Sequence, residues 1–278
     1  RRPVVRAEKR RLKMKTALSI AGSDSCAGAG IQADLKTFHA HGVYGLTAIT
    51  AVTVQNTQTV SAVQEMRPEI VRDQILCLFE DIEISALKVG MVFNASIIAA
   101  IAEAFEAVKP GNVVIDPVMI SKSGYSLLQP DAQKTLIEKL FPFADVLTPN
   151  LMEAQAISGT SIQSVEGMQK AARGICDLGP SSVVVQRGHL DRDRATDVFY
   201  DGHKAHELPG TFTQTRNTHG TGCTFSSAIA ANLALGASLP ESVRKAKAYI
   251  SETIAHGLNI GKGHGPTHHF YGMKMVEG

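Results

Sequence analysis

The segment TALSIAGSDSCAGAGIQADLKTFHAH, residues 16–41, carries the strongest indication of the fold. Its first part, residues 16–21, is apolar and has the length of a strand. Residues 28–41 follow with apolar side chains at helical spacing, at Ile31, Leu35 and Phe38. A buried strand that leads through a glycine-rich turn into an amphipathic helix is typical of α/β proteins, in which such units build a parallel sheet.

The same alternation of apolar runs and amphipathic stretches continues along the chain. We expect further strands at residues 46–54, 86–89, 113–115, 146–148 and 183–185. We expect further helices at residues 69–84, 95–108, 131–140, 165–178, 222–235 and 240–259. Residues 195–200 and 203–208 are joined through Asp201-Gly202, which predicts a β-hairpin. The pattern therefore predicts one α/β domain, with a mainly parallel central sheet flanked by helices on both faces.

The composition is that of an ordinary globular protein. The 278 residues are 44% hydrophobic and 19% charged. No apolar run approaches the roughly 18 residues that a membrane span requires. The net charge is +2, but residues 1–15 hold eight Lys or Arg and one Glu, whereas the remainder holds 20 basic and 25 acidic residues. This mildly acidic body argues against nucleic acid as the main partner, and we expect no membrane partner.

Residues 1–13 differ from the rest of the chain, since they lack apolar periodicity and Met14 stands just before the first strand. We interpret them as a leader, a cloning remnant or a misassigned start that is disordered, and residues 14–278 as the folded domain. A targeting peptide fits less well, because both the apolar stretch of a secretory signal and the serines of a transit peptide are missing. The cysteines form no Cys-x-x-Cys pair, which favours reduced thiols and a cytoplasmic location.

Polar residues and glycines follow the predicted strands. The stretches are Gly22-Ser23-Asp24, Gln55-Asn56-Thr57, Gly90-Met91, Asp116-Pro117-Val118-Met119, Pro149-Asn150 and Gln186-Arg187. Ligands of parallel sheets bind beyond the carboxyl ends of the strands. These residues therefore predict a small-molecule site at one rim of the sheet.

Three glycine-rich segments are candidates for phosphate binding. Gly28-x-Gly30-x-x-Ala33 is similar to a degenerate dinucleotide fingerprint, but the second strand ends in Gln55-Asn56 instead of an acidic residue, which disfavours nicotinamide binding. Residues 261–270 contain three histidines without the spacing of a zinc site. The chain has no G-x-x-x-x-G-K-[ST] motif, which excludes a P-loop enzyme.

The third segment, residues 217–224 (NTHGTGCT), is the most informative and is named the anion loop below. Its two glycines let backbone N–H groups converge at the start of a helix, where the helix dipole adds positive potential. A plain glycine-containing helix cap is the alternative. Cys223 lies in the first helical turn, where the dipole favours a thiolate, so it is suited to act as a nucleophile or as a base. Cys26, Cys77 and Cys176 are interpreted as inert.

Together these motifs resemble the hydroxymethylpyrimidine/phosphomethylpyrimidine kinase family of thiamin biosynthesis, within the ribokinase-like superfamily. The resemblance extends from about residue 15 to residue 270 and includes Gly28-Ala29-Gly30-Ile31-Gln32-Ala33-Asp34, Thr148-Pro149-Asn150 and Gly265-Pro266. It implies a ribokinase-like enzyme that uses ATP and Mg²⁺ to phosphorylate 4-amino-5-hydroxymethyl-2-methylpyrimidine, and then its monophosphate. It also implies a homodimer.

The resemblance assigns roles to individual residues. The pyrimidine site would contain Gly22, Asp34, Gln55, Met91 and Val118. Cys223 would accept the hydroxyl proton, and the N–H groups of Gly220, Thr221 and Gly222 would stabilise the transferring phosphoryl group. The nucleotide would contact Asp116, Asn150, Glu153, Gln186, Arg187, Thr218 and Lys247, with Mg²⁺ held by Asn150 and Glu153, mainly through water.

One motif departs from the family. Where the family usually has Lys-Gly-Gly-His, this chain has Gln186-Arg187-Gly188-His189, so a lysine that would neutralise nucleotide phosphates is missing. Arg187 is one position along, and neighbouring strand residues face opposite ways. Two other functions stay open, a pyridoxal or pyridoxine kinase and a non-catalytic pyrimidine-binding regulator. Gln55-Asn56-Thr57 favours the pyrimidine, and Cys223 argues against a mere binder.

Overall fold

The computed structural model describes residues 14–121, 124–129, 131–187 and 196–273. The expected leader lies outside these ranges, as do Gly188 and His189 of the divergent motif and the first residue of the predicted strand 195–200. In the described ranges, no helix combines the length and the apolar character that crossing a bilayer takes.

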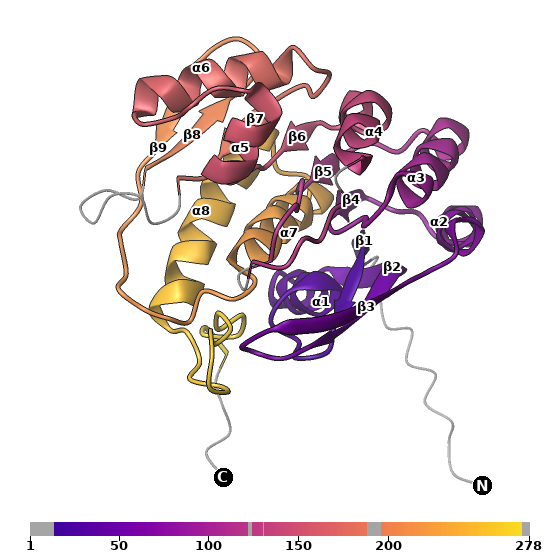
Figure 1. Ribbon diagram of the computed structural model, residues 1–278, viewed down its shortest axis with the longest axis horizontal. Coiled ribbons are helices and arrows are strands. Elements are labelled where there is room, and N and C mark those ends of the chain that lie inside the picture. Colours follow the sequence, from indigo (N-terminus) through magenta and orange to yellow (C-terminus); the bar gives the residue numbers. More distant parts are fainter. Residues whose placement is uncertain (1–13, 122–123, 130, 188–195, 274–278) are drawn as a thin grey trace, which may run out of the picture.

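A nine-stranded sheet forms the centre of the molecule (Figure 1). The strands are β1 (Thr16–Asp24), β2 (Tyr44–Gln55), β3 (Val60–Glu65), β4 (Ala86–Val89), β5 (Val113–Ile115), β6 (Val146–Leu147), β7 (Val183–Val185), β8 (Asp197–Tyr200) and β9 (Ala205–Leu208). Their order is β3-β2-β1-β4-β5-β6-β7-β8-β9. The strands from β2 to β7 in this order run parallel, whereas β3 at one edge and β8 and β9 at the other are antiparallel. The predicted mainly parallel sheet is confirmed.

Helices cover both faces of the sheet (Figure 1). One face carries α1 (Gly30–Ala40), α7 (Thr221–Ala234) and α8 (Leu239–Ala255). The other carries α2 (Pro68–Asp81), α3 (Ala95–Val108), α4 (Ala132–Lys139), α5 (Leu151–Ser158) and α6 (Val165–Cys176), with a short 3-10 helix, η1 (Phe141–Phe143), after α4. Helix α7 is sandwiched between the sheet and its neighbours α1 and α8, and every residue from Thr224 to Ala234 is buried. The small residues of its sequence permit this close packing.

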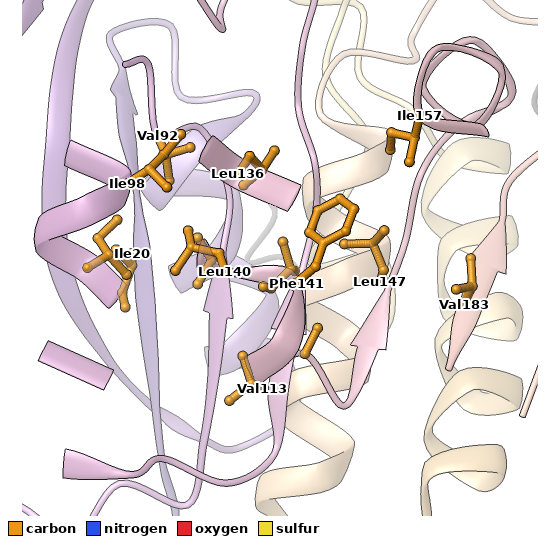
Figure 2. Close-up of a cluster of buried hydrophobic side chains, with 14 of the residues drawn as sticks. Ile20, Val92, Ile98, Val113, Leu136, Leu140, Phe141, Leu147, Ile157 and Val183 are labelled. Carbon is orange, nitrogen blue, oxygen red and sulfur yellow. The ribbon is translucent and has the colours of Figure 1, made fainter. Parts of the chain in front are cut away.

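The larger core lies between the sheet and helices α2 to α6. Figure 2 shows part of it, where Ile98, Leu136 and Phe141 of the helical layer pack over Ile20 and Leu147 of the sheet. Phe105 of α3 is fully buried beside them, and its ring meets that of Phe143 edge-on, with centroids 5.5 Å apart. This apolar layer covers one face of the sheet and leaves the carboxyl ends of the strands available for the site.

Besides the short η1, one strand and one α-helix were not predicted from the sequence. Strand β3 pairs antiparallel with β2 at the edge of the sheet, and its side chains are largely exposed, so it has no strong apolar pattern. Helix α5 begins with a capping box, in which Asn150 accepts the N–H of Glu153 and Glu153 accepts the N–H of Asn150. This Asn-x-x-Glu spacing is a recognised helix start that could have revealed α5.

The predicted hairpin is confirmed, and the start of α1 is corrected. Strands β8 and β9 are joined by a turn in which Asp201 accepts the N–H groups of His203 and Lys204. Helix α1 starts at Gly30 and not at residue 28, because the N–H groups of Gly28 and Ala29 are bound to the Asp24 carboxylate. These donors belong to the loop and not to the helix.

Replacement of Phe105 by Ala is expected to lower the free energy of unfolding by about 3–5 kcal/mol, the usual cost of the cavity that a buried aromatic ring leaves. Urea unfolding at neutral pH measures this. The control is Leu235→Ala at a side chain that is 48% exposed, where the change should stay within about 0.5 kcal/mol. A Phe105→Ala protein as stable as the control would contradict the assignment of Phe105 to the core.

Candidate functional site

The first glycine loop and the anion loop come together at the carboxyl end of β1. Gly220 caps α7 with a φ of 78°, in the left-handed region that favours glycine. A Cβ atom at Gly220 would also overlap the carbonyl oxygen of Gly28. Two of the three glycine-rich segments are thus neighbours, and glycine is required where their backbones meet.

The remaining glycine-rich segment, residues 261–270, completes this arrangement. The N–H group of His219 donates to the carbonyl of Gly265, at 3.0 Å. The N–H groups of Gly263 and His264 bind Thr57 in the loop after β2, at 3.1 and 2.9 Å. Residues 263–266 therefore connect the anion loop to the end of β2.

The anion loop keeps unpaired backbone donors at the start of α7. The N–H of Thr224 binds the Gly220 carbonyl at 2.8 Å, and the N–H of Thr221 binds the Thr218 carbonyl at 3.3 Å. The N–H groups of Gly222 and Cys223 have no partner in the described part of the chain. The donor at Thr221, expected to face a phosphoryl group, is thus used inside the loop, and Cys223 supplies one that was not predicted. Donors at a helix start form an anion site.

His219 and Asp24 form a buried pair that joins β1 to the anion loop. The His219 Nε2 atom lies 2.7 Å from an Asp24 oxygen. Burial alone would raise the pKa of Asp24, but the bond to His219 and the N–H of Ala29 outweigh it and lower the pKa to about 2. Asp24 is therefore a carboxylate at neutral pH. His219 was not singled out from the sequence, although it stands inside the anion loop next to Gly220.

Asp34 is not placed to contact a pyrimidine, and this expectation is corrected. Its side chain is fully buried, and both carboxylate oxygens lie 3.0 Å from the Lys88 ammonium group. The same carboxylate accepts the hydroxyls of Ser19 and Ser227, at 2.5 and 2.7 Å. These four bonds occupy the acceptor positions of Asp34. Asp34 therefore lies near the buried face of α1 because it binds Lys88 and two serines inside the protein.

The environment of Cys223 disfavours a thiolate, contrary to the expectation from the helix dipole. Burial raises the pKa of the thiol to about 12; Lys88 opposes this rise, whereas Asp116 and Asp34 add to it. Burial is the largest of these effects, so Cys223 carries its proton at neutral pH.

Asp116 lies directly below the anion loop. It follows β5 and is 3% exposed. One of its oxygens accepts the Ser226 hydroxyl at 3.2 Å and would lie 3.6 Å from a Cβ atom on Gly222. Burial raises the pKa of Asp116 to about 6, against the opposing charge of Lys88. Asp116 thus titrates near neutral pH.

The residues that we expected to bind the pyrimidine lie around the ends of β1, β2 and β4. A Cβ on Gly22 would lie 2.9 Å from the Met91 sulfur, so the two residues are in contact. Gln55 is half-buried, and its amide nitrogen lies 3.4 Å from His219 Nε2. Val118 is half-buried in the loop after β5. Gln55 thus lies beside the anion loop and Gly22 lies against Met91, while no contact of Val118 with these three is seen in the described residues.

Residues expected at the nucleotide gather at the ends of β6 and β7. The Gln186 amide donates to the Thr148 carbonyl at 2.7 Å, and its backbone bridges to Asn150. The Arg187 N–H and the Lys247 ammonium group both bind Asp197, at 3.0 and 2.6 Å. These contacts bring Gln186, Arg187 and Lys247 together. Thr218 is buried, and its carbonyl accepts the Thr221 hydroxyl.

The oxygen ligands at this rim fit a hard cation such as Mg²⁺. Besides the N–H of Asn150, Glu153 accepts the N–H of Met119 in the loop after β5, so its carboxylate faces the segment that holds Asp116. The side chains of Asn150 and Glu153 are both engaged in the capping box, so either would bind a cation through the oxygen lone pairs that the box leaves free. Oxygen donors of this kind suit Mg²⁺. Asp24, Cys26 and His219 also place one ligand atom each within 4.8 Å of one another, but Asp24 is already bound to His219 and to backbone N–H groups.

Comparison with known proteins places these residues in a family context. The family described as phosphomethylpyrimidine kinase matches residues 24–268. A hydroxymethylpyrimidine/phosphomethylpyrimidine kinase of Rhizobium meliloti (strain 1021) is 51% identical over 258 residues, which make up 92% of this chain and 97% of that protein.

Solved structures agree with the fold. A pyridoxal kinase of Bacillus subtilis, in complex with ADP, has 41% identity and a TM-score of 0.86, over 92% of this chain and 97% of that one. A pyridoxal kinase of Staphylococcus aureus, in complex with AMP-PCP and pyridoxal, has 38% identity and a TM-score of 0.84, over 92% of this chain and 93% of that one. The ribokinase-like fold expected from the sequence is confirmed.

Replacement of Asp24 by Asn should destabilise the protein in a pH-dependent way. The lowered pKa of Asp24 adds stability that is complete above the unfolded value of 3.8 and is lost as the pH falls through about 2. Such a shift corresponds to about 2 kcal/mol at pH 7. The stability difference between wild type and variant should shrink to roughly half of that near pH 3.

Guanidinium unfolding at both pH values measures the Asp24 effect, with exposed Asp177→Asn as the matched control that should change neither value. An Asp24→Asn variant with the same deficit at pH 3 as at pH 7 would argue against an ionised Asp24 carboxylate as the source of the effect.

Proposed function

This chain belongs to the phosphomethylpyrimidine kinase family, and we propose that it transfers the γ-phosphoryl group of ATP to the hydroxymethyl oxygen of 4-amino-5-hydroxymethyl-2-methylpyrimidine. A second transfer then phosphorylates the monophosphate to the pyrophosphate, for thiamin biosynthesis. The observation that carries this proposal is the anion loop, which has free N–H groups at Gly222 and Cys223 and which Gln55 contacts through His219. Hydrogen-bond donors for a phosphoryl group and an amide that can bind a small polar ring thus meet at one rim.

In the proposed transfer, a bond forms between the substrate hydroxyl oxygen and the γ-phosphorus while the bond from that phosphorus to the bridging oxygen breaks and ADP leaves. The donors at Gly222 and Cys223 stabilise charge on the transferring group. The hydroxyl proton moves to the Cys223 sulfur. Because the pKa of Cys223 is about 12, only a small thiolate fraction can accept this proton at neutral pH.

Substrate and metal binding follow from the same residues. The amide of Gln55 has a donor and an acceptor to offer the aminopyrimidine, and Met91 packs against its ring. Asp116 and Glu153 would hold Mg²⁺, directly or through water, and the bound cation would neutralise charge on the ATP phosphates. Gln186, Arg187 and Lys247 lie together and are proposed contacts of the nucleotide, and Thr218 of the anion loop is proposed as another.

Pyridoxal phosphorylation is the second candidate, because the two solved structures above are pyridoxal kinases at 41% and 38% identity. The position of Gln55 beside His219 favours the pyrimidine. Product analysis with Mg-ATP, combined with kcat/KM for both alcohols, separates the two functions. A clear preference for pyridoxal, or no diphosphate product, would overturn the assignment.

We also propose the extent of the catalytic domain, its location and its oligomeric state. Residues 14–278 would form one catalytic domain in a cytoplasmic homodimer. Support for the dimer comes from β2, where Val52 and Val54 point to the same side and are 43% and 59% exposed beside the edge strand. Light scattering on the purified protein would give the mass that decides it.

Replacement of Cys223 by Ala or Ser should lower kcat by roughly 10²–10⁴, the range for a lost proton acceptor. Because the thiol pKa is about 12, the wild-type kcat should rise about tenfold per pH unit between pH 7 and 9, as the thiolate fraction grows. Single-turnover rates across this range measure both effects. A flat wild-type profile, or a Cys223→Ala enzyme at full rate, would leave Cys223 without a role as base.

Replacement of Gln186 by Lys should lower the KM for ATP by about threefold to tenfold, because an ammonium group would add a charge contact with the nucleotide phosphates. The KM for the alcohol serves as an internal control and should not change. Equal KM values for ATP in both proteins would show that this position does not limit nucleotide binding.

A further inference from the structure

Lys88 is a buried cation that the proposed mechanism does not use. It lies in β4, in the middle of the sheet, and is fully buried. Its ammonium group packs against Gly90, where a Cβ atom would come within 2.6 Å of Nζ. A lysine charge without water costs several kcal/mol unless it is paired, so the position needs a specific partner.

That partner connects Lys88 to the start of α7. Asp34 holds the ammonium group with both oxygens at 3.0 Å and accepts the Ser227 hydroxyl at 2.7 Å. Ser227 stands four residues after Cys223, on the same side of α7 and one turn further along. The chain of contacts Lys88–Asp34–Ser227 therefore fixes α7 one turn below Cys223.

A second carboxylate holds the preceding residue of the helix. Asp116 accepts the Ser226 hydroxyl at 3.2 Å and lies against Gly222. Two neighbouring serines of α7 are thus bound to two buried carboxylates, and Lys88 is the cation between them. Burial lowers the pKa of Lys88, but Asp34, Cys223 and Asp116 outweigh this and raise it, so the ammonium group keeps its charge. In return, Lys88 lowers the pKa of both Cys223 and Asp116.

We propose that Lys88 is a positioning residue of the phosphoryl-transfer site. Through Asp34 and Ser227 it sets the depth of α7 and so the place of Cys223 and the anion loop, and its positive charge promotes the reactivity of the Cys223 thiol. The link to turnover rests on the proposed function, whereas the link to the reactivity of Cys223 does not.

The first test measures alkylation of Cys223 by iodoacetamide, in a protein whose Cys26, Cys77 and Cys176 are replaced by Ser. Lys88→Met alone would leave Asp34 as an uncompensated buried charge, so the variant used is Lys88→Met with Asp34→Asn, which removes both charges at similar volume. Because Lys88 lowers the pKa of Cys223 by more than Asp34 raises it, removal of both charges should slow alkylation at pH 9 by about threefold, the effect of a pKa rise of about half a unit. A mere loosening of the structure would speed it instead. An unchanged or faster reaction overturns the electrostatic part of the proposal.

The second test uses Ser227→Ala, which keeps every charge and breaks only the link to α7. We expect kcat for phosphorylation of the pyrimidine alcohol to fall about tenfold, with KM for both substrates unchanged within about twofold. The matched control is Ser242→Ala, a buried serine of α8 whose hydroxyl has no hydrogen-bond partner in the described residues. A Ser227→Ala enzyme with the kcat of this control overturns the positioning role.

The two tests separate failure of the inference from failure of the proposed function. If the wild-type protein does not phosphorylate the pyrimidine alcohol, the proposed function fails. The alkylation experiment needs no substrate, and its sign then still decides whether Lys88 controls Cys223.

Discussion

The hydrogen bond between His219 and Asp24 is the contact on which the arrangement of the site depends. It joins residues 195 positions apart in the chain, the last residue of β1 and the residue before the cap of α7. Because Asp24 also binds the N–H groups of Gly28 and Ala29, the first glycine loop is held in the shape that lets Gly220 approach the carbonyl of Gly28. One carboxylate thereby organises two loops. Its strongly lowered pKa reflects how completely this single group is solvated by protein donors instead of water.

Much of the fold could be predicted from the sequence, because strands buried on both faces and amphipathic helices leave clear periodic patterns. The elements that escaped prediction lack that pattern. Strand β3 is an edge strand with exposed side chains, and α5 is short and starts directly after Pro149-Asn150, a stretch interpreted only as ligand-binding. In α5 one pair of residues serves as helix cap and as metal-ligand candidate at once, and the local rule for helix starts was the better guide.

The site was predictable only as far as it depends on residues close in sequence. The glycines and Cys223 of the anion loop were found because a helix start is a local feature. The partner of Asp34 was not, since it is 54 residues away in β4. A charged residue in the run Ala86-Leu87-Lys88-Val89 was nevertheless a usable signal, because a central strand covered on both faces must pair such a charge inside the protein. The pKa of Cys223 is raised mainly by burial, with further contributions from Asp116 after β5 and Asp34 in α1, so its direction could be obtained only from the structure.

The binding of residues 263–266 to the loop after β2 has a consequence for how the polypeptide matures during synthesis. The segment that connects the anion loop to Thr57 follows α8 in the sequence, and the His219 N–H can donate to the Gly265 carbonyl only after that segment has been made. While the ribosome is still translating α8, strands such as β1 and β2 can already pair with each other. The rim of the sheet that holds the site is still incomplete at that stage. A nascent chain therefore folds gradually but becomes active only in one step after α8 has been made. Premature termination directly after α8 would release a nearly folded protein that is inactive.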